Sequence, residues 1–101
     1  MTENDIMHAV QLEASKLGAR LFRNNVGLFT TLDGRKVRTG LCTGSSDLIG
    51  WYKGRFLAVE VKTRTGVVRK EQQAFIDQVV NDGGLGCIVR EPGELTEYLT
   101  K

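Results

Sequence analysis

The chain of 101 residues is 41% hydrophobic and 26% charged with a formal net charge of +2, and this length predicts one domain over residues 1–101. No apolar run approaches the about 18 residues of a membrane helix, and the acidic N-terminus is unlike a secretion signal, so we expect a cytoplasmic protein. The single His8 and the distant Cys42 and Cys87 lack zinc-ligand spacing, which predicts buried thiols and no zinc site.

Hydrophobic spacing and turn residues predict the element order αβ(ββ)ββαβα. The first element is a helix from a cap at Thr2 or Asn4 to about Leu17, ended by Gly18. It is followed by a strand at 19–24 and a hairpin at 27–38 with a two-residue Asp33-Gly34 turn. Strands at 47–52 and 55–62 come next, joined by Lys53-Gly54. The chain then forms a helix at 70–82 with Phe75, Ile76, Val79 and Val80 inward, a strand at 85–91, and a final helix from Pro92. This order predicts an α/β or α+β fold, with a mixed sheet flanked by helices.

Two acids and a lysine interrupt the neighbouring strands at 47–52 and 55–62. With Lys53-Gly54 as a two-residue turn, the register places Asp47 opposite Glu60, with Cβ atoms about 4.5–5.5 Å apart. Lys62 projects from the same face as Glu60. Facing carboxylates need a compensating positive charge. A divalent ion such as Mg²⁺ or Mn²⁺ supplies it in one interpretation, and a buried salt bridge with Lys62 supplies it in the other.

Three neighbours of this cluster favour a functional site. The small residues of TGSS before Asp47 leave room for a phosphate to approach. Glu3 falls on the inward stripe of the first helix, with Glu13 at the stripe's edge as the weaker candidate, although an acid is also favourable in any first helical turn. Gln72 opens the second long helix, where a glutamine can orient water or contact a phosphate.

Basic residues gather in two segments of the chain. Five lie between Arg20 and Arg38 against one acid, Asp33, and VKTRTGVVRK holds four with no acid. Such clusters are typical of polyanion binding, and equally of a solvated surface.

The order and spacing of these pieces resemble the virus-type replication-repair nuclease (VRR-NUC) domains of the PD-(D/E)XK nuclease superfamily. The matching pieces are Glu3, GARLFRNNVG at 18–27, GSSDLIG at 44–50, AVEVKT at 58–63 and RKEQQAF at 69–75. Ser46 stands where the family usually has a proline that shapes the turn. Gln72 matches the family glutamine better than Gln73. The resemblance covers nearly the whole chain and implies a restriction-endonuclease-like core.

The resemblance implies metal-dependent hydrolysis of a phosphodiester bond. Asp47, Glu60 and the Val61 carbonyl would hold Mg²⁺ or Mn²⁺, Glu3 would act through water or a second ion, and Lys62 would position or help deprotonate the attacking water. The expected catalytic set is therefore Asp47, Glu60, Lys62, Gln72 and Glu3. The expected DNA contacts are Arg23, Asn24, Arg35, Lys36, Arg38, Ser45, Arg64 and Arg69.

Stand-alone domains of this kind resemble Holliday-junction resolvases, which implies a homodimer that cuts branched DNA, a junction or a flap, in replication, recombination or repair. The setting implied is a bacterial cell or a phage-infected host. The alternative is a non-catalytic nucleic-acid-binding module on the same fold, and a regulatory domain with a structural salt bridge is a more distant one.

Overall fold

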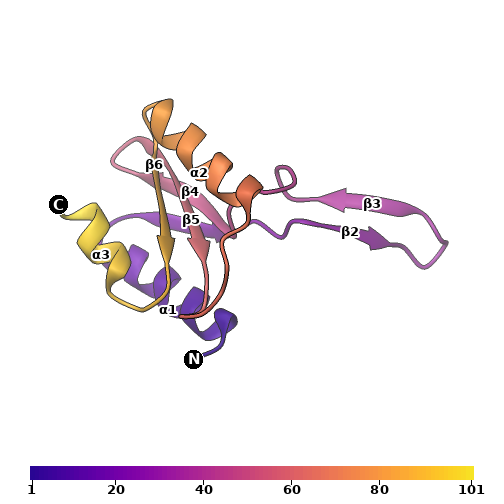
Figure 1. Ribbon diagram of the computed structural model, residues 1–101, viewed down its shortest axis with the longest axis horizontal. Helices are drawn as coiled ribbons and strands as arrows, with labels where there is room; N and C mark the ends of the chain where they lie inside the picture. The colour runs from indigo at the N-terminus through magenta and orange to yellow at the C-terminus, as the bar shows by residue number, and fades with distance from the viewer.

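The computed structural model describes residues 1–101 and contains the elements in the predicted order (Figure 1). They are α1 Glu3–Lys16, β1 Arg20–Arg23, β2 Gly27–Thr30, β3 Lys36–Thr39, β4 Leu48–Tyr52, β5 Arg55–Val61, α2 Lys70–Asn81, β6 Leu85–Val89 and α3 Glu94–Leu99. None of the helices combines the length and apolar character that a membrane span requires.

Four strands form a mixed sheet in the order β1-β4-β5-β6. The first three strands run antiparallel, and β6 lies parallel to β5 after the crossover through α2. Side chains alternate across this sheet. Leu48, Leu57 and Val59 pack with α1 in the main core, whereas Gly86 meets Ile76 of α2 on the other face. The sheet is therefore covered by α1 and α3 on one face and by α2 on the other, as a mixed α+β fold requires.

The turn between β4 and β5 fixes the register on which the candidate site depends. Lys53 and Gly54 both have left-handed backbone angles, φ 48° and φ 79°, which define the two-residue turn that favours this pair. Tyr52 pairs with Arg55 and Leu48 pairs with Val59, so the predicted register is confirmed.

The hairpin of β2 and β3 is confirmed, but its predicted two-residue turn is wrong. The Thr31 amide donates to the Arg35 carbonyl at 2.8 Å, which leaves a three-residue loop at 32–34. Gly34 at φ 85° takes the left-handed position that closes such a loop. The hairpin forms a separate two-stranded sheet that projects from the body of the molecule (Figure 1).

Three smaller expectations are also corrected. The last helix begins at Glu94 rather than Pro92, because Gly93 at φ 99° interrupts the backbone there. Val80 is exposed rather than inward, because it lies beside Gly86 of β6, the edge strand of the sheet. Cys42 is exposed because it lies in the loop between β3 and β4, whereas Cys87 is half-buried, and burial raises the pKa of its thiol to about 12. The cap of α1 is Thr2, in a reciprocal pair of hydrogen bonds with Asp5.

Gly50→Ala is expected to lower the free energy of unfolding by about 3 kcal/mol or more. A Cβ atom on Gly50 would lie 1.7 Å from the carbonyl oxygen of Arg20, so β1 and β4 would have to separate. Urea unfolding measures the loss. Gly66→Ala is the control, because the nearest atom to its Cβ would be the Thr63 hydroxyl oxygen at 3.2 Å, and its next neighbours would lie at an ordinary contact distance of 3.4 Å. Equal unfolding midpoints for the two variants would contradict this account of the strand contact.

Candidate active site

Asp47 and Glu60 lie opposite each other one position beyond the pairing of Leu48 with Val59. Two backbone contacts hold Asp47 there. Its carbonyl accepts from the Asn24 amide at 2.8 Å, and its Oδ2 accepts from the Val61 amide at 2.9 Å. The aspartate is thus fixed between the end of β1 and the end of β5, beside the glutamate.

The Glu60 carboxylate is buried and incompletely bonded. The residue is 1% exposed, and its Oε2 has no hydrogen-bond partner. Burial, and after it the adjoining Asp47 carboxyl, raise the pKa of Glu60 to about 9, although the charge of Lys62 opposes the rise. A buried acceptor without a partner is costly, so this position calls for a cation or a proton.

No ion pair supplies that charge. The salt bridges of the protein join Arg35 to Asp33, Arg64 to Glu91 and Arg69 to Glu71, all at the surface. Lys62 is half-buried at the end of β5, where its amide donates to the Val89 carbonyl at 3.0 Å, and its ammonium pairs with no acid. The buried salt bridge considered from the sequence is absent.

Glu3 and Glu13 have different surroundings. Glu13 accepts hydrogen bonds from the Gly93 amide at 3.0 Å and from the Thr96 amide at 2.7 Å, so it caps the N-terminus of α3. Glu3 is exposed rather than on the inward stripe, and its charge adds to the raised pKa of Glu60. Of the two acids, Glu3 is the one whose field reaches the carboxylate pair.

The two glutamines also differ. Gln72 is buried, and its Oε1 accepts from the Arg69 amide at 2.9 Å at the start of α2. Gln73 is exposed and donates to Asp77 along the helix. Gln72 borders the same cleft as Asp47.

This cleft has a volume of about 400 Å³ and opens between α1, α2 and the base of the hairpin. Its polar lining includes Arg23, Asn24, Ser45, Asp47, Arg69 and Gln72, with Met7 and Phe29 among the apolar residues. Arg23 and Arg69 give it positive charge beside the aspartate, which suits an anionic substrate.

Asn24 and Ser45 serve mainly to hold the cleft together. The Asn24 amide group donates to Ser45 Oγ and to the Ser46 carbonyl, both at 2.8 Å, and its Oδ1 accepts from the Leu41 amide at 3.0 Å. Ser46 is fully buried, and its hydroxyl donates to the Leu48 carbonyl at 2.9 Å. These bonds fix the turn before Asp47, the turn in which Ser46 replaces the family's usual proline.

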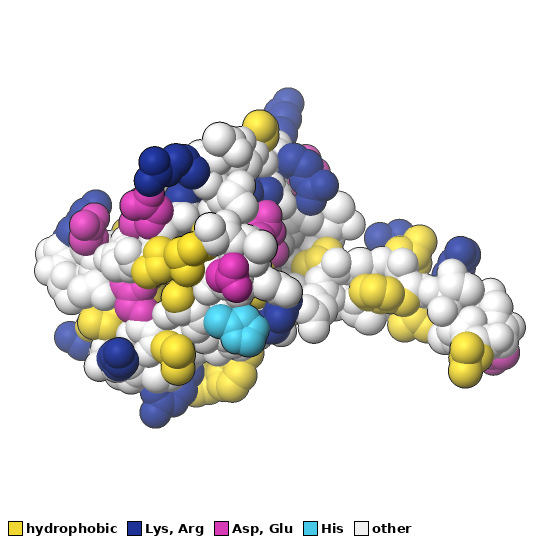
Figure 2. Space-filling model, turned by 90° about the horizontal axis from the view of Figure 1, so that it is seen from below, with side chains coloured by type: hydrophobic (Ala, Val, Ile, Leu, Met, Phe, Trp, Pro, Cys, Tyr) yellow, Lys and Arg dark blue, Asp and Glu magenta, His cyan; other side chains and the backbone are white.

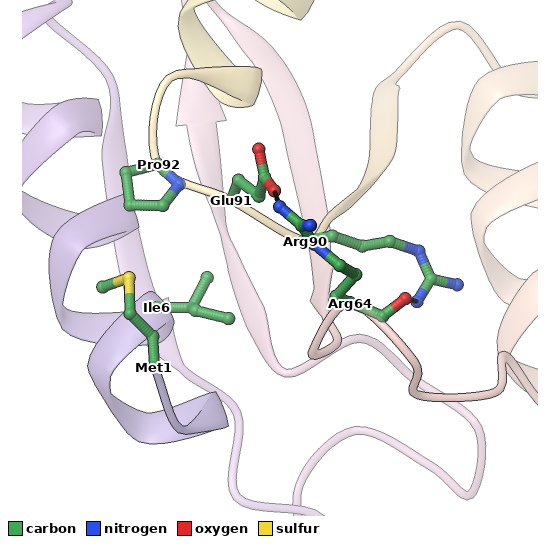
Figure 3. A pocket seen from close by; sticks show the side chains of 6 residues that line it. All are labelled: Met1, Ile6, Arg64, Arg90, Glu91 and Pro92. Carbon is green, nitrogen blue, oxygen red and sulfur yellow. Dashed lines mark hydrogen bonds and ion pairs between the residues drawn. The ribbon is translucent and has the colours of Figure 1, made fainter.

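The other predicted DNA contacts lie outside the cleft. Arg35, Lys36 and Arg38 lie on the projecting hairpin. Arg64 borders a second cavity and is joined to Glu91 at 2.5 Å (Figure 3). Arg90 is not among the residues predicted from the sequence. Its Nη1 donates to the Thr63 and Gly66 carbonyls at 2.7 Å and holds the loop after Lys62. Only the fold brings Arg90 next to the loop after Lys62.

A divalent ion fits the residues present. No three His, Cys, Asp or Glu side chains come together as a metal cluster, so the ligands would be the carboxylates of Asp47 and Glu60, a backbone carbonyl such as that of Val61, and water. Few protein oxygens supplemented by water are the usual ligands of Mg²⁺. The Glu60 oxygen without a partner, opposite Asp47, is the observation that favours an ion at this position.

A helix-flanked mixed sheet, with an acid before one strand and a Glu-Val-Lys sequence ending the next, defines a PD-(D/E)XK-like nuclease fold. The VRR-NUC domain family matches residues 4–90, and the chain belongs to this family. A search of curated proteins gave no match. The predicted resemblance and fold class are confirmed, and membership indicates a nuclease of DNA repair, of a fold that usually uses divalent metals.

Proposed function

We propose that the protein is a metal-dependent, structure-selective endonuclease that hydrolyses phosphodiester bonds in branched DNA, a Holliday junction or a flap. The observation that carries the proposal is the buried Glu60 carboxylate, which faces Asp47, has one oxygen without a partner and is not neutralised by any ion pair. A cation at this position would supply the positive charge that no ion pair of the fold supplies.

Each site residue has a role that its surroundings support. Asp47 and Glu60 would hold Mg²⁺ or Mn²⁺ together with the Val61 carbonyl, and the Val61 amide keeps Asp47 in place. Lys62, unpaired at the end of β5, would accept or hold a proton of the attacking water and offset charge on the phosphate. Glu3 would bind water at the outer edge, and Gln72 would orient the substrate across the cleft.

When bound, the divalent ion would supply positive charge against the phosphate and make a nearby water more acidic. Arg23 and Arg69, which line the same cleft, would anchor the DNA backbone beside the carboxylates. These contacts carry no sequence information, so selection among substrates would rest on DNA shape.

An exposed aromatic strip supports a homodimer. Phe22, Trp51 and Phe56 lie on the same face of β1, β4 and β5, because Trp51 pairs with Phe56 and the Phe22 and Trp51 ring centroids are 5.6 Å apart. All three are exposed. Clustered exposed aromatics on a sheet are typical of a protein interface, and two-fold pairing would provide one site for each strand of a junction.

The test is cleavage of labelled duplex, single strand, flap and four-way junction with Mg²⁺, with Mn²⁺ and with EDTA. We expect ion-dependent cutting of the branched substrates in preference to the duplex. Lys62→Ala should cut at least about 100-fold more slowly, and Lys16→Ala, an exposed lysine at the end of α1, should match the parent protein. Binding without ion-dependent cutting would instead favour the non-catalytic module.

A further inference from the structure

The arm, residues 27–39, is a ribbon without a partner. β2 and β3 pair only with each other and extend from the body along the longest dimension of the molecule, 48 Å against 32 and 25 Å (Figure 1). An isolated two-stranded hairpin is marginally stable in water. Its side chains are nearly all exposed, and hydrophobic and basic groups are interleaved along it (Figure 2).

The two faces of the arm differ in character. On one face, Leu28 pairs with Arg38 and Thr30 pairs with Lys36, whose Nζ donates to the Thr30 hydroxyl at 2.9 Å. On the other face, Phe29 pairs with Val37. Phe29 also lines the cleft of Asp47, so the apolar face of the arm continues directly from the catalytic opening.

The tip of the arm presents a leucine. Leu32 begins the three-residue loop and is fully exposed, more so than any other large hydrophobic residue of the protein. The one acid of the arm, Asp33, is paired with Arg35 at 3.0 Å. With a rise of about 3.3 Å per residue, Leu32 lies roughly 10 Å beyond Phe29, or about three base steps of DNA.

The root of the arm is fixed to the site. Thr39 Oγ1 donates to the Asn25 carbonyl at 2.7 Å, and Asn24 bonds the Leu41 amide as well as the turn before Asp47. Gly40, at φ 81°, lies so close to Val26 that a Cβ atom there would be 2.8 Å from the Val26 Cα. The root of the arm is therefore held to the turn that carries Asp47.

We propose that the arm distinguishes branched DNA from duplex: Lys36 and Arg38 bind phosphates, and Leu32 stacks on the base pair exposed at a branch point. An apolar tip gains nothing from a phosphate, whereas leucine side chains that wedge against base steps are an established means of contacting bases. In a continuous duplex the base faces are covered by their neighbours, so the contact is available only where stacking is broken. The inference rests on the proposed function and makes Leu32 its specificity-determining residue.

Charge favours DNA over a second copy of the chain as the occupant. The arm carries three basic residues against one acid. Two arms meeting face to face across a two-fold axis would bring Lys36 and Arg38 against the same residues of the partner, which is repulsive. A polyanion satisfies all of these charges.

The experiment compares Leu32→Gln with Leu12→Gln, the same change at an exposed leucine of α1. The substrates are a duplex and a four-way junction with 2-aminopurine at the branch, titrated in EDTA and then cut with Mg²⁺. We expect Leu32→Gln to lower the junction-to-duplex affinity ratio about tenfold and to remove the fluorescence change at the branch, whereas Leu12→Gln retains both. Leu32→Ala, which removes the side chain without adding a polar group, should behave like Leu32→Gln.

Each outcome decides the inference. An unchanged affinity ratio and fluorescence signal in both Leu32 variants would overturn it, and so would dissociation of a DNA-free dimer by Leu32→Gln in sedimentation, which would make a second copy the occupant. Branch binding that depends on Leu32 but is never followed by cutting would overturn the proposed function and leave this inference standing. Ion-dependent junction cutting that is independent of Leu32 would do the reverse.

Discussion

Glu60→Gln is expected to lower the rate of DNA cleavage by at least about 1,000-fold, because it removes a charge from the carboxylate pair while keeping the shape of the side chain. The measurement is a single-turnover rate on a four-way junction. A second reading comes from the protein alone. Mg²⁺ or Mn²⁺ should raise the melting temperature of the parent protein and leave that of Glu60→Gln nearly unchanged.

The matched control is Glu97→Gln, the same substitution at an exposed position of α3. This variant should retain both the cleavage rate and the ion-dependent rise in melting temperature. Ion-dependent cleavage by Glu60→Gln at the parental rate would show that the buried carboxylate has no part in the reaction, and the proposed active site would be wrong.

The second large effect concerns stability without metal. Burial and the nearby Asp47 raise the pKa of Glu60 from 4.5 to about 9, so between these pH values the folded protein holds a proton that the unfolded chain has released. Raising the pH through this window therefore favours the unfolded state, by up to about 1.4 kcal/mol per pH unit. Glutamine carries no such proton, so Glu60→Gln should be more stable than the parent, and increasingly so toward alkaline pH.

Urea unfolding in EDTA between about pH 5 and about pH 8 measures the free energy of unfolding of the parent protein and of Glu60→Gln. The difference in free energy of unfolding should grow steadily across the range, with the variant above the parent. A constant difference would mean that Glu60 ionises in the folded protein as it does in the unfolded chain. In that case Glu60→Gln would lose activity without the predicted pH-dependent gain in stability.

The parts of the site that were predictable follow from local rules. The Lys53-Gly54 turn admits one register, and that register alone places Asp47 opposite Glu60. The hairpin at Asp33-Gly34 was predicted for the same reason, but its loop gained a residue because Thr31 and Arg35 pair next to the turn. The extra residue in the loop changes which side chain lies at the tip of the hairpin. A turn signal in the sequence therefore predicts the hairpin but not the length of its loop.

The parts that were missed depend on contacts between distant segments. Glu13 is a candidate acid in the sequence, but in the fold it caps the N-terminus of α3, which lies some eighty residues further along the chain. Asn24 is predicted to contact DNA, yet its side chain is buried and bonded to Ser45, Ser46 and the Leu41 amide. The partnerless oxygen of Glu60 is likewise a property of the packed structure, since burial cannot be read from a carboxylate's position in a strand.

The arm is an insertion between two strands that pair with each other, since Arg23 at the end of β1 lies opposite Leu48 at the start of β4. Closing a longer or shorter loop between such strands changes the entropic cost by only about 0.6 kcal/mol for each doubling of length. The catalytic sheet would therefore tolerate exchange of the whole segment, provided that Asn24 and the turn before Asp47 remain. A nuclease of this build can acquire a new substrate preference by replacing one hairpin, with its hydrolytic machinery left untouched.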